Sequence, residues 1–264
     1  MLRDIALGQY IPGGSPLHRL DARVKLVVGI ALAAALFVVN AWAGYGILAA
    51  FVLAATLLSG LPLGYVARGL RPVLWLVALT VVLHVLFTPG TPLVNAGPLQ
   101  VTAEGVDTAG RLAVRLILLV AGVSLITLTT SPVALTDGLE WLLKPGGRLG
   151  LPAHELAMMM TIALRFVPTF LEELDRIVKA QKARGAELDT GGPVQRARAL
   201  VPVLVPLFVS AFRRAEDLAL AMEARCWRGA AGRTRFRAGR WEARDAVVLA
   251  GSLLLLAWVG WRFR

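Results

Sequence analysis

The chain has 264 residues, of which 57% are hydrophobic, and its formal net charge at pH 7 is +11. A soluble domain carries about 45–50% apolar residues, so the excess here indicates a protein that buries apolar surface in lipid. The basic residues alternate with apolar segments and form no nucleic-acid-binding signature. Nucleic acid is therefore excluded as a binding partner. The positive charge would instead attract anionic lipid or an acidic protein.

The chain has a single cysteine, Cys226, and three histidines far apart in the sequence. One thiol excludes an internal disulfide, and no Cys/His cluster has the spacing of a metal site. The chain also lacks the G-x-x-x-x-G-K-S/T motif that cradles nucleotide phosphates. We therefore expect this chain to bind no metal and no cofactor itself, and to be non-catalytic.

The first apolar stretch follows a basic lead that contains Arg19, Arg23 and Lys25. Residues 26–67 then carry no charge. At about 1.5 Å per residue, this stretch is about 63 Å long as a helix, enough to cross a hydrocarbon core of about 30 Å twice. A signal peptide cleaved near Ala43 is the alternative, but a second apolar stretch follows almost at once.

Two further spans are expected next along the chain. A loop with Arg68 and Arg71 precedes the third span, at about residues 73–88. The stretch from 89 to 110 is rich in Pro, Gly and Thr, and it predicts a loop before the fourth span, at about residues 112–130. Arg115 lies in the first turn of that span. Its side chain is expected to extend to the membrane interface, with pairing inside the bundle as the alternative.

Basic residues set the expected topology, because cytoplasmic loops of membrane proteins are enriched in Lys and Arg. This rule places the N-terminus in the cytoplasm and the loop before the fourth span outside. It returns residues 131–244, with 18 of the 28 Lys and Arg, to the cytoplasm. The expected domains are a four-span membrane region at 1–130, cytoplasmic amphipathic helices at 131–244, and a C-terminal span at 245–264. The protein is thus expected to be multi-pass in the plasma (inner) membrane.

Two amphipathic helices are predicted within this cytoplasmic segment. Pro168 is expected to break or kink a first helix, which contains Arg165, and is favoured at the start of a second one. Gly185 is well placed as the left-handed residue after the end of that helix. Its last residues are Ala183, Arg184 and Gly185.

The other amphipathic helix follows residues 201–210, where two prolines favour an interfacial piece over a membrane span. It has a row of small residues, Ala211, Ala215 and Ala219, that would let another helix cross closely. Polar residues flank this row: Arg214, Glu216, Asp217 and Glu223. The helix ends in Ala224, Arg225 and Cys226.

Both helices therefore end in Ala-Arg followed by a small residue. An arginine at a helix C-terminus can simply complement the helix dipole, and this is the alternative. The recurrence in a basic segment of a membrane protein favours a second interpretation. Two rigid arginine tips suit insertion into carboxylate-lined grooves on a partner, because the guanidinium makes paired, charge-assisted hydrogen bonds.

These two ends resemble those of the transmembrane T component of energy-coupling factor (ECF) importers. Further segments share the resemblance: YIPGGSPLHRLDARVKL at 10–26, Glu155 through LRFVP at 164–168, RRAED at 213–217 and MEAR at 222–225. Where the family has a glycine after the second arginine, this chain has Cys226, which carries a steric penalty in the left-handed conformation.

The resemblance implies a role in energy coupling. The family's T component joins two cytoplasmic ATP-binding-cassette ATPases to a small membrane subunit that captures a vitamin or a metal ion. Each arginine is implied to dock on one ATPase, so that Arg184 and Arg225 form the docking site with their neighbours. Arg165, Pro168, Arg214, Glu216, Asp217 and Glu223 are implied to support the coupling helices. ATP and Mg would be used by the partner ATPases.

The sequence thus predicts an all-α polytopic membrane protein with about five transmembrane helices and a coupling module of amphipathic helices. A membrane-embedded enzyme and a self-sufficient channel or secondary transporter are the alternatives. These would usually show ionisable residues at mid-span or internal repeats, and the sequence has neither.

Overall fold

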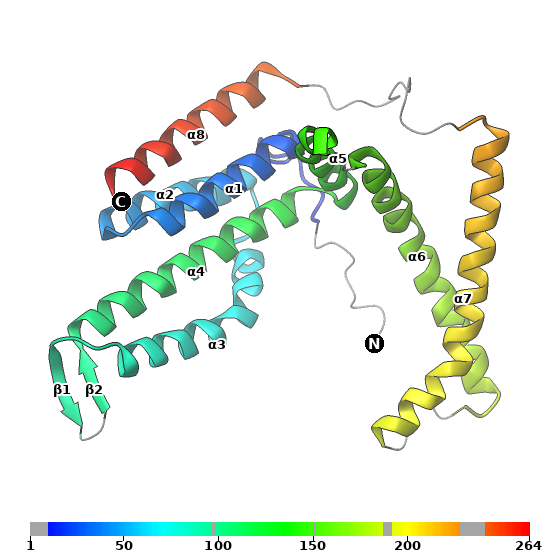
Figure 1. Cartoon of the computed structure of the whole chain (residues 1–264), viewed down its shortest axis with the longest axis horizontal. Coiled ribbons are helices and arrows are strands. Elements are labelled where there is room, and N and C mark those ends of the chain that lie inside the picture. Colours follow the sequence, from blue (N-terminus) through cyan, green and yellow to red (C-terminus); the bar gives the residue numbers. More distant parts are fainter. Residues whose placement is uncertain (1–9, 97–98, 150–151, 187–191, 228–240) are drawn as a thin grey trace. The chain divides into compact units, whose positions relative to one another are not determined.

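The structure is a computed structural model that describes residues 10–96, 99–149, 152–186, 192–227 and 241–264. Eight α-helices make up most of this part of the chain (Figure 1), so the all-α prediction is confirmed. The helices form two compact units. We call residues 10–142 with 241–264 the bundle unit, and residues 143–227 the helix-pair unit.

The bundle unit contains six helices. They are α1 (Ala22–Val38), α2 (Trp42–Ser59), α3 (Leu63–Phe87), α4 (Ala103–Thr129), α5 (Pro132–Leu143) and α8 (Ala243–Arg262). Helix α8 packs on α1, and α4 packs on α1, α2 and α3 (Figure 1). The core lies between α1, α2, α4 and α8, where Leu36, Val39, Leu48 and Val259 are fully buried.

A buried carboxylate joins the start of α1 to the start of α8. Asp245 is 1% exposed, and its two oxygens accept from the backbone N–H groups of Asp21 at 3.3 Å and Glu242 at 3.0 Å. Asp21 in turn caps α1, because its carboxylate accepts from the N–H of Arg23 at 2.8 Å. These bonds satisfy N–H groups that have no partner within their own helices.

Arg115 takes the alternative conformation, inside the bundle. Its Nη2 donates to the Tyr45 hydroxyl at 2.8 Å, and that hydroxyl donates to the Val39 carbonyl at 2.9 Å. The guanidinium also lies 5.3 Å from the centre of the Phe37 ring. The expectation that this side chain extends to the interface is therefore wrong, because a buried phenol and an aromatic face are within reach of the guanidinium.

The loop expected before the fourth span is shorter than predicted. Strands β1 (Pro92–Ala96) and β2 (Leu99–Thr102) form an antiparallel hairpin, and α4 begins directly after it, about nine residues earlier than expected. Thr102 explains the early start, because its hydroxyl accepts from the N–H of Gly105 at 3.0 Å and caps the helix.

Among the described residues, five helices are long and apolar enough to cross a bilayer, by length and composition alone: α2, Ala67–Phe87 of α3, α4, Val194–Ala224 of α7 and α8. The expected number of spans agrees with this set. Helix α1, also expected to cross, has 17 residues and is about 26 Å long, close to a hydrocarbon core of about 30 Å. Helix α7 belongs to the set because it is one continuous helix through the prolines that were expected to set off an interfacial piece.

The helix-pair unit consists of a 3-10 turn, η2 (Lys144–Leu149), and two long helices, α6 (Ala153–Ala183) and α7 (Pro193–Ala224). The break expected at Pro168 does not occur, because α6 continues through it. The rings of Phe166 and Phe170 lie on either side of this proline along the helix, with centroids 5.9 Å apart. Side-chain packing thus maintains the helix where one backbone hydrogen bond is lost.

Helix α7 likewise continues through Pro202 and Pro206. Pro206 has no N–H, so the Pro202 carbonyl one turn earlier loses its helical donor. Gln181 of α6 replaces that donor, since its Nε2 lies 3.3 Å from the Pro202 carbonyl oxygen. A contact between helices therefore compensates for the proline, which is a relation that local sequence does not reveal.

Candidate functional site

The two helices of the helix-pair unit end in the same backbone motif. At the end of α6, the N–H of Gly185 donates to the Lys182 carbonyl and the N–H of Ala186 donates to the Gln181 carbonyl, both at 3.0 Å. Gly185 has φ +86°. This is the Schellman motif, which fixes the direction of the chain beyond Arg184. The left-handed cap expected at Gly185 is confirmed.

Helix α7 ends in the same way. The N–H of Cys226 donates to the Glu223 carbonyl at 2.8 Å, and the N–H of Trp227 donates to the Met222 carbonyl at 3.0 Å. Cys226 has φ +55° and is the single non-glycine residue with positive φ among the described residues. The cysteine therefore occupies the left-handed position that glycine takes at the end of α6, despite the steric penalty of its Cβ.

Arg184 and Arg225 occupy equivalent positions at these two ends. Each is the residue between the last helical alanine and the left-handed residue. Both arginines are exposed, as are Ala183 and Ala224 before them. In the part of the chain that the structure describes, neither guanidinium has an ion pair. Each end thus carries an exposed guanidinium next to a backbone that the cap holds in place.

An ion pair joins the two helices between these ends. Arg214 of α7 donates from Nη2 to Oε2 of Glu173 in α6 at 2.9 Å, with side chains 35% and 20% exposed. A hydrogen bond from Ser210 and the Arg214 guanidinium hold the pKa of Glu173 below its usual value. The carboxylate therefore stays charged at neutral pH, and Arg214 also lies 6.0 Å from the Phe170 ring centre.

The ion pair is equidistant from the two arginine tips along the chain. Eleven residues separate Glu173 from Arg184, and eleven separate Arg214 from Arg225. The helices run antiparallel, since Glu173 contacts Arg214 and Gln181 contacts Pro202 further along (Figure 1). The tips therefore point to opposite ends of the pair, about 33 Å apart along the helix axes.

The row of small residues on α7 lines a groove beside α6. Ala211, Ala215 and Ala219 face it together with Phe166 and Phe170, and its volume is about 610 Å³. Glu223, predicted to support this helix, lines the same groove near its end. Arg165, Pro168, Glu216 and Asp217 are exposed on the two helices. Among the described residues, no hydrogen bond or ion pair involves the side chains of Arg165, Glu216 or Asp217.

Comparison with known proteins identifies the chain's relatives. The family model described as cobalt transport protein (CbiQ) matches residues 13–236. The chain belongs to this family. Its relatives include three named energy-coupling factor transporter transmembrane protein EcfT. The one from Thermosediminibacter oceani is 52% identical, over 99% of both chains. Those from Thermanaerovibrio acidaminovorans and Brevibacillus brevis are 54% identical over 93% of this chain and 91% of theirs, and 51% identical over 99% of both.

Membership of the CbiQ family, together with the apolar helices, shows that this is a multi-pass membrane protein involved in transport. The resemblance inferred from the two Ala-Arg ends and the neighbouring motifs is therefore confirmed. Residues 228–240, at the end of the predicted cytoplasmic segment 131–244, lie outside the described residues, and the predicted domain boundaries stay predictions.

Sequence reasoning did not single out Glu173. Several acidic residues lie on this part of α6, and those at 172 and 175 form apparent pairs with basic residues one turn later. The signal that distinguishes Glu173 is its spacing, because it precedes Arg184 by the same eleven residues that separate Arg214 from Arg225. That relation becomes informative only when the two helices are known to be antiparallel.

Proposed function

We propose that this chain is the transmembrane coupling subunit of an energy-coupling factor importer, in which Arg184 and Arg225 each dock on one of two ATP-binding-cassette ATPases. The observation that supports this proposal most directly is the pair of helix ends with the same backbone motif. Each holds an exposed arginine at the same position of a Schellman motif. The names of the EcfT relatives support the same role.

The helix pair would pass ATPase motion to a small membrane subunit that captures the substrate, a vitamin or a transition-metal ion. A guanidinium held by a rigid helix end makes directional contacts to carboxylates, so movement of the ATPase surface moves the helix. The exposed apolar side chains of α7, such as Phe208 and Phe212, offer a surface for a membrane partner. The chain itself would bind no cofactor and catalyse no reaction, with ATP and Mg used by the ATPases.

The docking test uses the whole importer with substitutions at the two tips. Removing one partner of a buried, hydrogen-bonded charge pair costs about 2–5 kcal/mol, whereas an arginine that only complements a helix dipole is worth about 0.3–1 kcal/mol. Arg184→Ala or Arg225→Ala should therefore weaken co-purification of the ATPases and reduce ATP-dependent uptake. The double Arg→Glu variant should lose both almost completely, and lysine should rescue in part.

Arg71→Glu provides the control, because Arg71 is also an exposed arginine but belongs to α3 of the bundle unit and to neither helix end. It should retain the ATPases and uptake. Normal assembly and uptake in the double Arg→Glu variant at positions 184 and 225 would show that these residues merely end their helices, and the docking role would be abandoned.

We also propose that the N-terminus and the helix-pair unit are cytoplasmic and that the β1–β2 hairpin is outside the inner membrane. The charge distribution supports this orientation. A cysteine introduced at Thr91, in a Cys226→Ser background, should react with an impermeant maleimide added from outside to intact cells. Labelling of that cysteine only from the cytoplasmic side would refute the topology.

A further inference from the structure

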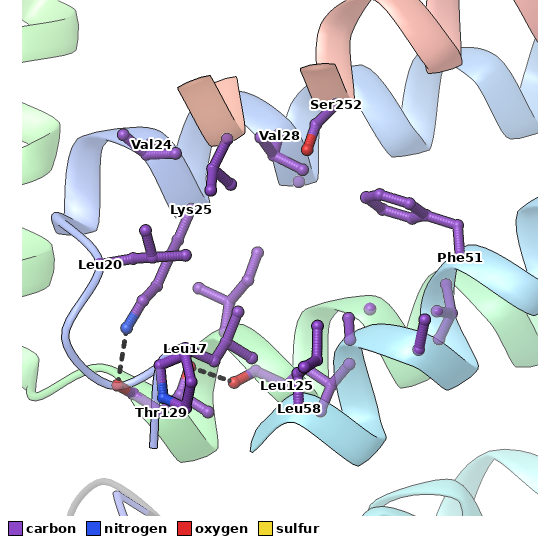
Figure 2. A pocket seen from close by; sticks show the side chains of 18 of the residues that line it. Leu17, Leu20, Val24, Lys25, Val28, Phe51, Leu58, Leu125, Thr129 and Ser252 are labelled. Carbon is purple, nitrogen blue, oxygen red and sulfur yellow. Dashed lines mark hydrogen bonds between the residues drawn. The ribbon is translucent and has the colours of Figure 1, made fainter. Parts of the chain in front are cut away.

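The bundle unit has a partly open apolar cavity, and none of the residues assigned to the coupling role lines it. It lies between α1, α2, α4 and α8 and has a volume of about 730 Å³ (Figure 2). Val28, Phe51 and Leu125 line it from three of these helices, and Ser252 faces it from α8 (Figure 2). This volume falls within the range of about 300–1,000 Å³ that small-molecule sites in proteins occupy.

One end of the cavity is basic. Lys25 lines it and is only 6% exposed. Its Nζ donates to the Thr129 carbonyl at 2.8 Å (Figure 2) and to the Thr130 hydroxyl at 3.2 Å, which uses two of its three N–H groups on neutral oxygens. The Asp21 carboxylate acts on this ammonium from beyond ion-pair distance, so an anion at the third N–H would offset part of the cost of burying the charge.

Two arginines line the same end of the cavity. Arg244 donates from Nη2 to the Arg19 carbonyl at 3.1 Å, which holds the two residues together. Arg244 is already paired with Glu242 at 3.1 Å. Arg19 is exposed, and among the described residues neither Arg19 nor Lys25 forms an ion pair. The cavity therefore has two cations available to an incoming anion.

The depth of the cavity matches one leaflet of a bilayer. Helices α1 and α8 line it with their N-terminal halves, and α2 and α4 with their C-terminal halves, so it lies at one end of all four. From Arg244 to Ser252 the cavity follows α8 for about 12 Å, close to half of a hydrocarbon core of about 30 Å. Its basic end thus lies at headgroup level and its apolar end near the membrane centre.

We propose that this cavity binds one anionic phospholipid, with the phosphate at Arg19 and Lys25 and an acyl chain between α1, α2, α4 and α8. The cavity has cations at its interfacial end and apolar side chains over the depth of one leaflet. This arrangement complements an anionic phospholipid better than a soluble anion, which has no acyl chain, or a neutral lipid, which has no net charge. Basic pockets between transmembrane helices hold anionic headgroups for the same reason.

The test measures lipid retention by the purified full-length chain. The protein is exchanged into nanodiscs of equimolar phosphatidylglycerol and phosphatidylcholine, released, and analysed by native mass spectrometry. The wild type should retain one phosphatidylglycerol in preference to phosphatidylcholine. Arg19→Gln should reduce that preference about five-fold, the factor for one basic residue near an anionic lipid surface. Ser252→Leu should reduce retention of the lipid while keeping every cation, because it fills the cavity.

Two matched controls separate the site from general effects. Arg68→Gln removes a cation that does not line the cavity, and Ser252→Ala removes the hydroxyl without adding bulk; both should retain the lipid as the wild type does. Equal retention of the two lipids, or unchanged retention in Ser252→Leu, would overturn the proposal. Inorganic phosphate that displaces phosphatidylglycerol completely would also overturn it, by showing an anion site without an acyl-chain site.

Discussion

The two units of this protein are stabilised in different ways. In the bundle unit, α1, α2, α4 and α8 surround a continuous core whose central residues, Leu36 and Leu48 among them, are fully buried. In the helix-pair unit, three described residues are buried: Ala153, Ala157 and Val203. The long helices α6 and α7 are joined by a few polar contacts beside an open groove, while Phe212 and Leu220 remain 68% and 64% exposed.

This difference concerns how far the contacts within each unit hold it together. The bundle unit has a buried core, and its exposed apolar side chains, such as Trp75, lie on helices apolar enough for lipid to surround. The helix pair exposes comparable side chains and has little core to hold it, which is typical of a surface that another protein covers. Few internal contacts make a region one of the less stable parts of a structure. The elements that move when a partner binds are drawn from such parts.

The largest expected effect tests the core of the bundle unit. Leu48→Ala removes a fully buried side chain and should lower the free energy of unfolding by about 2–5 kcal/mol. Leu204→Ala on α7 removes the same atoms from a side chain that is 43% exposed and should change it by less than about 0.5 kcal/mol. Thermal unfolding in detergent measures both. Equal shifts in the midpoint would show that the two units do not differ in packing.

A smaller effect is expected where α6 compensates for a proline in α7. Gln181→Leu removes the side-chain donor of the Pro202 carbonyl, an exposed group that water can partly satisfy, and should destabilise the helix pair by about 0.5–1.5 kcal/mol. Pro206→Ala restores the backbone donor within α7, so Gln181→Leu should have almost no further effect in that background. A double-mutant cycle with hydrogen exchange of α7 tests this relation. An equal effect of Gln181→Leu with and without Pro206 would contradict it.

The smallest effect concerns the cap of α7. Cys226→Gly should raise the free energy of unfolding slightly, by about 1 kcal/mol or less, because glycine adopts the left-handed conformation without a steric penalty. ATPase binding should be kept. Cys226→Ser retains the Cβ and should give no such gain. Loss of transport in both variants, with the complex intact, would show instead that the thiol itself has a function.

Features that depend only on residues close together in the chain could be predicted from the sequence. The apolar stretches, the left-handed position at Gly185 and the recurring Ala-Arg ends are all local patterns, and the structure has each of them. Features that depend on two distant segments were missed or wrong. Helix α7 continues through Pro206, because Gln181 of α6 supplies the donor that the proline lacks. Pro168 differs, since the Phe166–Phe170 contact that accompanies it is local and was missed all the same. Arg115 pairs with Tyr45, and no spacing in either helix indicates this contact. Glu173 is likewise recognisable only once Arg214 is known to lie beside it.

The equal distances from the Glu173–Arg214 contact to Arg184 and Arg225 have a mechanical consequence. The two segments are the arms of a lever whose fulcrum is this ion pair, each about 16 Å long. A rotation of about 10° at the fulcrum displaces each tip by about 3 Å, in opposite directions. If the two ATPases dock as proposed and move symmetrically, they would apply a torque to the helix pair and no net force. On the same proposal, the rotation would tilt a membrane partner bound to the helix pair.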